Sequence, residues 1–173
     1  MAAHPRALNE AVRDSLRALA AGRWSEWNGL VVFPPEDIVE QALGPSLDTA
    51  ARSGMLGGSP TFFRRYPPVV GAPRGVTAWF EEDTAVTIEI HDAIPAGGDV
   101  LDQPDATIES QFGPKWRQEI YASRGLVLHR RGDAVALLYG IAPCTVDDWM
   151  SDPLRHSGPP TRQRSPRSPD RRS

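Results

Sequence analysis

The chain has 173 residues, of which 40% are hydrophobic and 24% charged, and its formal net charge is −3. This length and composition predict a packed globular domain, or two small ones that share a core. The single cysteine, Cys144, excludes an internal disulfide and a zinc site built from several cysteines.

The first predicted element is an amphipathic helix over residues 6–21. Its leucines and valine recur at helical spacing, Pro5 stands near its start and Gly22 follows its end. The acidic Glu10 and Asp14 argue against a transit peptide, and no apolar stretch reaches the length of a signal core or a membrane span. We therefore expect a core-packing helix in a soluble, cytoplasmic protein.

The middle of the chain contains an internal repetition of pattern. Residues 74–79 (RGVTAW) correspond to residues 124–129 (RGLVLH), and each opens a predicted β-hairpin around a charged turn. Upstream of each hairpin, an aromatic and basic strand ends in a tyrosine, Tyr66 or Tyr121, and a proline-led helix start comes before it. The sequence therefore predicts an α+β fold in which a duplicated helix-plus-three-strand unit forms antiparallel sheet.

Four segments follow from this pattern. Residues 1–33 hold the first helix and a connector, residues 34–95 the first unit, and residues 96–150 the second unit, with a helix predicted near residue 95 and another at 145–150. Residues 151–173 carry six arginines and two aspartates, a charge of +4, which leaves −7 on the first 150 residues. This Pro, Ser and Arg composition predicts a disordered tail.

The order of elements over residues 34–143 resembles the tandem design of the β-lactamase inhibitor protein and the related small outer-membrane lipoprotein A domains. The resemblance concerns architecture and includes no specific motif. This sequence lacks the export signal of those proteins and the cysteine pair in each repeat of the inhibitor. The resemblance implies a concave sheet face that grips another protein, and it transfers no functional residue to this chain.

Strand alternation assigns one face of each hairpin to the core and leaves the other face open. We predict that the open faces together form an exposed apolar and aromatic patch, which is typical of an interaction site, with the tryptophan as its anchor. The alternative is that the first helix, the segment 46–60 or a second subunit covers this patch. The open faces carry six candidate binding residues: Trp79, Glu89, His91, Val127, His129 and Leu138.

Few residues are candidates for catalysis. Cys144 follows Pro143 at a predicted helix start, where the helix dipole would stabilise a thiolate, and His91 or His129 would then be its base. Nothing in the sequence brings these residues together. The histidines stand on different strands, which predicts no metal site, and no phosphate-binding or dinucleotide-binding fingerprint predicts a cofactor.

Two classes of function remain open. The first is a non-catalytic intracellular binding protein, such as an inhibitor, an immunity protein or a regulatory partner, whose sheet face contacts another protein or a second copy of this chain. The acidic body argues against nucleic acid as the main ligand, except for weak contacts through the tail. The second class is a small cofactor-independent enzyme that uses His91 or His129 with Tyr66 or Tyr121 as acid–base groups. The first predicts an open surface, and the second predicts a pocket with converging polar groups.

Overall fold

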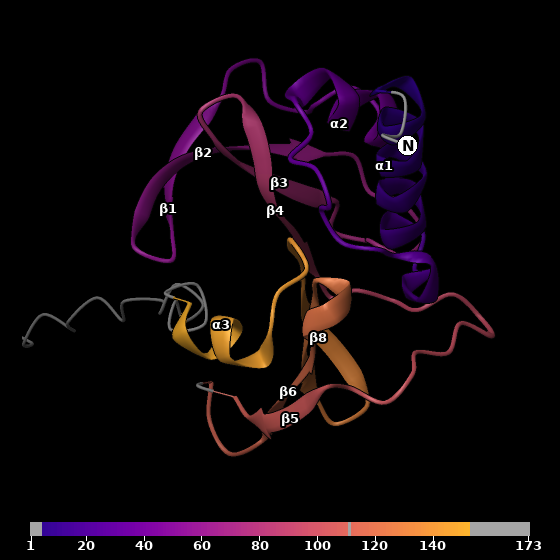
Figure 1. Cartoon of the computed structure of the whole chain (residues 1–173), viewed down its shortest axis with the longest axis vertical. Helices are drawn as coiled ribbons and strands as arrows, with labels where there is room; N and C mark the ends of the chain where they lie inside the picture. Colours follow the sequence, from indigo (N-terminus) through magenta and orange to yellow (C-terminus); the bar gives the residue numbers. More distant parts are fainter. Residues whose placement is uncertain (1–4, 111, 153–173) are drawn as a thin grey trace, which may run out of the picture.

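The computed structural model describes residues 5–110 and 112–152, so the predicted tail beyond Asp152 lies outside the described residues. These residues form three α-helices and one antiparallel sheet of eight strands, which confirms the predicted α+β class (Figure 1). The helices are α1 (Pro5–Ala20), α2 (Glu36–Leu43) and α3 (Val146–Ser151), with short 3₁₀ helices at Trp24–Glu26 (η1) and Ala122–Arg124 (η2). The strands are β1 (Arg52–Leu56), β2 (Ser59–Tyr66), β3 (Val76–Glu81), β4 (Thr84–His91), β5 (Ala106–Glu109), β6 (Trp116–Tyr121), β7 (Leu126–Arg131) and β8 (Ala134–Gly140).

The sheet consists of two four-strand meanders that share one joint. Strands β1 to β4 pair in chain order, as do β5 to β8, and the halves meet where Ile88–His91 of β4 pairs with Leu137–Gly140 of β8. The prediction of three strands in each half is wrong, because it omits β1 and β5. These strands are short, with five and four residues, and β1 lacks a regular alternation of apolar and polar residues along its length.

The helix predicted near Pro95 is absent. The segment from Asp92 to Asp105 contains turns and irregular structure, and Gly98 adopts a φ of 82° that a helix does not accommodate. The second half of the sheet therefore has no helix before its strands. The structure does not confirm the duplicated unit as it was predicted from the sequence.

One face of the sheet, here called the helix face, packs against α1, α2 and η1 (Figure 1). The apolar stripe of α1 and the indole of Trp27 press against strand β8 at Gly140, where a Cβ would lie 2.9 Å from both Leu19 and Trp27. The Trp27 indole Nε1 also donates a hydrogen bond of 3.0 Å to the carbonyl of Gly125. These contacts join the N-terminal segment to the second half of the sheet.

The opposite face, here called the α3 face, is covered by a helix over the second half only (Figure 1). Trp149 of α3 is 1% exposed and packs in a cluster with Ile120, Val127 and Tyr139. Leu56, at the tip of the β1–β2 hairpin, reaches the same cluster. Among the described residues, no helix covers the α3 face of strands β2 to β4.

A β-bulge changes the face assignment in the second hairpin. The register shifts between His129 and Arg130, so that Leu138 lies opposite Leu128 and packs on the helix face. Its neighbours Leu137 and Tyr139 pack on the α3 face instead. The sequence-based prediction assigned Leu137 and Tyr139 to the core face and Leu138 to the open face, which is the reverse. A bulge inserts one residue into the strand, so strict alternation assigns the residues beyond it to the wrong face.

Among the described residues, no helix is both long and apolar enough to span a lipid bilayer.

Candidate functional site

The six predicted binding residues fall into two groups. Trp79, Glu89 and His91 lie together on the uncovered part of the α3 face. Val127, His129 and Leu138 are 0% exposed, so the prediction of one exposed patch is wrong for these three. Val127 belongs to the cluster under α3, Phe112 packs on the His129 ring, and the bulge turns Leu138 into the core of the helix face.

The first group forms a hydrogen-bonded unit around Glu89. The Trp79 indole Nε1 donates to Glu89 Oε2 at 3.0 Å, and Glu89 Oε1 contacts the ring Nε2 of His91. The Trp79 ring packs 4.8 Å from the Phe63 ring and also lies over Gly54, where a Cβ would lie 2.9 Å from the indole. The carboxylate and these ring contacts hold the indole in one orientation. We call this surface, made by Phe63, Thr77, Trp79, Thr87 and Glu89, the Trp79 face.

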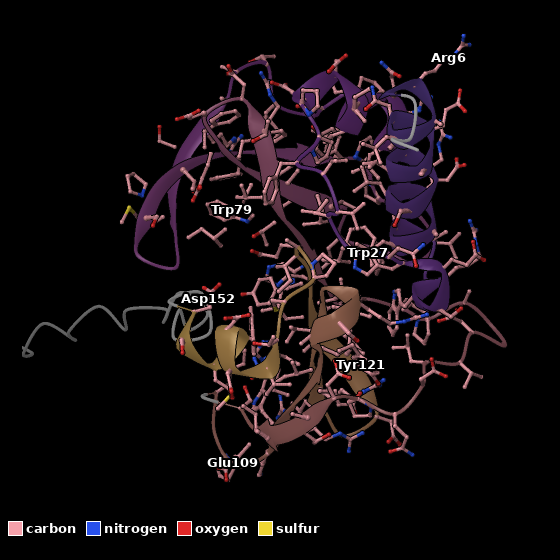
Figure 2. The ribbon with its side chains drawn as sticks, in the orientation of Figure 1. Arg6, Trp27, Trp79, Glu109, Tyr121 and Asp152 are labelled. Atoms are coloured by element: carbon pink, nitrogen blue, oxygen red, sulfur yellow. The ribbon has the colours of Figure 1, made fainter. Side chains whose placement is uncertain are left out.

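A groove with a volume of about 340 Å³ lies beside the Trp79 face. Figure 2 shows Trp79 on the side of the first-half strands that faces α3, with Asp152 at the end of that helix. We call it the α3 groove, because α3 and the end of β8 form one wall and the β1–β2 turn and β4 form the other. Among the described residues its lining includes three carboxylates and no lysine or arginine. The carboxylates are those of Glu81, Asp148 and Asp152, and the larger apolar side chains are those of Phe33, Leu56, Val86, Ile141 and Trp149.

Cys144 lines this groove, but it is not activated. Burial raises the pKa of its thiol, and so do the nearby carboxylates of Asp148 and Asp152. The N-cap of α3 is Thr145, whose side chain accepts a hydrogen bond from the backbone N–H of Asp148. Cys144 therefore precedes the cap of a helix of six residues, and the prediction of a stabilised thiolate is wrong.

His129 belongs to a buried polar network. Its ring Nδ1 lies 3.2 Å from Ser110 Oγ and its Nε2 lies 3.1 Å from Gln118 Nε2. Burial lowers the pKa of His129 to about 4, so the ring is neutral at pH 7. The Phe112 ring packs 4.7 Å from it. The network connects the segment after β5 to the sheet, and its enclosure removes His129 as an acid–base group for a substrate.

The sequence analysis missed a second polar cluster, which lies on the helix face of the second half. Arg117, Glu119 and Tyr121 alternate along β6, and Arg130 lies beside them on β7. They line a cavity of about 410 Å³, here called the Glu119 cavity, which is closed on its other side by Trp24 and the segment 95–101. Only Tyr121 had been a candidate. The alternation of these side chains along β6 is the sequence pattern that could have indicated this cluster. No local pattern predicts its contact with Trp24.

Tyr66 and Tyr121 were the predicted partners of a catalytic histidine. Both pack in the core on the helix face, whereas His91 lies on the α3 face. Burial raises the pKa of both phenols, and the Tyr66 hydroxyl has no hydrogen-bond partner among the described residues. The structure therefore does not bring either tyrosine to His91.

The described part of the chain contains no group of three His, Cys, Asp or Glu side chains arranged to hold a metal ion. In the comparisons with known proteins, no family model, no curated protein and no solved structure matches this chain.

Proposed function

We propose that this protein is a non-catalytic binding protein that holds a segment of another protein against the Trp79 face and the α3 groove. One observation supports this proposal above all. The helix α3 covers only half of its face, so that Trp79 remains partly exposed while its indole is fixed by Glu89. Rigid, partly exposed aromatic side chains are the usual anchors of protein interfaces.

The lining of the α3 groove indicates the chemistry of the partner. Its charged side chains are carboxylates, and among the described residues no basic side chain lines it. Phe33 is 51% exposed beside Leu56 and offers an apolar contact at the rim. A groove with an acidic rim and apolar walls suits a basic segment that carries one or two apolar side chains. The partner we propose is therefore a basic, partly apolar segment of another protein.

The tandem architecture belongs to the same proposal. Two four-strand halves joined edge to edge give one long sheet, and we propose that the halves derive from one ancestral unit. On this reading, the protein would act as an intracellular inhibitor, immunity protein or regulatory partner by steric occlusion. The enzyme alternative has less support, because His129 is enclosed and neutral and Tyr66 and Tyr121 lie on the other face.

The test is a selection from a library of random 12-residue peptides, followed by affinity measurements on purified protein by fluorescence anisotropy. We expect the selected peptides to be rich in Lys or Arg and in large apolar residues, and to bind more weakly as salt rises. The Trp79→Ala variant should weaken binding about tenfold or more, as loss of an interface anchor does. The variant Val70→Ala is the matched control, because Val70 is 85% exposed and lies outside the groove.

Two results would contradict the proposal. One is enrichment of acidic peptides. The other is equal affinity of the wild type and Trp79→Ala, provided that both unfold at the same temperature.

A further inference from the structure

We propose that the Glu119 cavity binds a small organic carboxylate. This site lies on the helix face of the sheet, whereas the surface proposed for a protein partner lies on the opposite face, the α3 face. The inference therefore does not depend on the proposed function.

The cavity is built from buried and half-buried polar side chains. Glu119 is 13% exposed and Arg130 is 19% exposed at the side chain, and Tyr121 is 6% exposed overall. Arg117 is half-exposed at the mouth. In the described part of the chain no α-helix lines this cavity, which has a volume of about 410 Å³ and is bounded by η1 and the segment 95–101. A cavity of this size suits a small ligand.

The hydrogen-bond acceptors of the cavity are already occupied. Glu119 accepts from Arg117 Nε at 3.0 Å and from Arg130 Nε at 2.7 Å, and the Tyr121 hydroxyl lies 3.5 Å away. The other carboxylate, Asp99, accepts from the backbone N–H groups of Trp24 and Ser25 at 3.0 and 3.2 Å. Neither carboxylate is left without donors, so neither creates a need for a cation.

The donors, in contrast, exceed the acceptors. Two guanidinium groups share the Glu119 carboxylate, while backbone N–H groups of Trp24 and Ser25 hold the Asp99 carboxylate, so neither carboxylate occupies the remaining arginine donors. Arg117 bonds Glu119 through Nε, so its two Nη groups, which form the fork that binds carboxylates, stay available at the mouth. The indole Nε1 of Trp24, which lines the cavity and is 1% exposed overall, has no hydrogen-bond partner among the described residues. The two oxygens of a ligand carboxylate would supply acceptors to these donors, in the geometry that a guanidinium fork binds.

The rest of the lining indicates what is attached to the anion. Pro95, Val100 and Leu101 line the cavity, and Val100 is 77% exposed at its rim. Contact with an apolar ligand group would remove this exposed side chain from water, which is favourable in free energy. A carboxylate head against Arg117 and a short apolar body against Val100 would use both parts of the lining.

The experiment titrates the full chain with sodium hexanoate and, as the neutral match, hexanamide. Binding is followed by isothermal calorimetry and by the indole N–H signals in NMR spectra, with the Trp24 signal assigned from a Trp24→Phe sample. We expect hexanoate to bind and to shift the Trp24 signal, and hexanamide to bind at least tenfold more weakly. Arg117→Gln should weaken hexanoate binding about tenfold, whereas Arg74→Gln, which removes an exposed arginine outside the cavity, should not change it.

A second variant keeps the test sound if Arg117→Gln disturbs the strand. Val100→Asp places a negative charge at an exposed position on the rim and should also weaken hexanoate binding. Equal affinity for hexanoate and hexanamide, no binding at about 10 mM, or unchanged binding by both variants would overturn the proposal. Tighter binding of inorganic phosphate than of hexanoate would overturn the assignment to a carboxylate. Arg117→Gln should bind the selected basic peptides as the wild type does, which separates this site from the α3 groove.

Discussion

The buried ring of His129 makes the stability of the fold depend on pH. Burial lowers the pKa of His129 in the folded protein to about 4, from the 6.5 that is ordinary for a histidine side chain. Below pH 6.5 the unfolded chain takes up a proton that the folded chain does not bind, so the free energy of unfolding falls as the pH falls. The loss begins near pH 6.5 and is complete below about pH 4.

The size of the effect follows from the two pKa values. Between pH 7 and pH 5 the difference in proton binding at His129 removes about 2 kcal/mol of stability, and below pH 4 the loss reaches about 3 kcal/mol. The replacement His129→Gln keeps a polar group near Ser110 and Gln118 but does not titrate. The variant is less stable than the wild type at pH 7, since the new side chain fits less well. Between pH 7 and pH 5, however, its free energy of unfolding should fall by about 2 kcal/mol less than that of the wild type.

The assay is urea denaturation at pH 7, 6 and 5, with the free energy of unfolding extrapolated to zero urea. The control is His91→Gln, because the side chain of His91 is 42% exposed and lies outside this network. It should retain the steep loss. If His129→Gln and the wild type lose the same stability between pH 7 and pH 5, His129 is not the group responsible and the reasoning fails.

Three further predictions test the backbone and the groove. Gly125 and Gly132 have φ angles of 62° and 63°, but a Cβ on Gly125 would lie 2.1 Å from the carbonyl oxygen of Ile141, and a Cβ on Gly132 meets nothing within 4 Å. Gly125→Ala should therefore cost about 4 kcal/mol or more in urea denaturation, and Gly132→Ala only about 1 kcal/mol; similar costs would refute the steric argument. Cys144 should react with iodoacetamide more slowly at pH 8 than a free thiol, and Asp148→Asn should move its pH–rate profile to lower pH; an unmoved profile would exclude the effect of that carboxylate. Gly54→Ala should displace the Trp79 ring and change the tryptophan fluorescence, whereas Gly44→Ala, in open space, should not.

The sequence predicts the local elements of this fold better than their pairing. The helices α1 and α2 follow from amphipathic spacing and from proline and glycine at their ends, and the hairpins β3–β4 and β7–β8 follow from alternation around charged turns. The edge strands β1 and β5 were missed; they have only five and four residues. The joint between β4 and β8 depends on contacts between distant residues, which no local pattern encodes.

For the candidate sites, too, the local arrangement was predictable from the sequence and the long-range contacts were not. Trp79 and Glu89 were predicted together because they share a face in one hairpin, and the structure joins them through a hydrogen bond. Alternation correctly assigned Val127 and His129 to the face opposite the helix face, but the prediction that this face is open there was wrong, because α3 and Phe112 cover these residues. Whether a face is covered depends on where distant segments dock, and that is set by packing over the whole chain.

The joint between the two meanders also has a consequence for synthesis of the chain on the ribosome. Strand β4 can pair with β3 as soon as both have been made. The other edge of Ile88–His91 stays unpaired until β8, near the C-terminal end of the described chain, has been made. Until then only the start of β4 is protected, where the backbone N–H of Ala85 donates to the carbonyl of Pro34 at 2.8 Å. An unpaired edge that carries Ile88 and Ile90 invites pairing with other nascent chains. The order of the strands thus leaves this apolar edge open until β8, the last strand of the sheet, has been made.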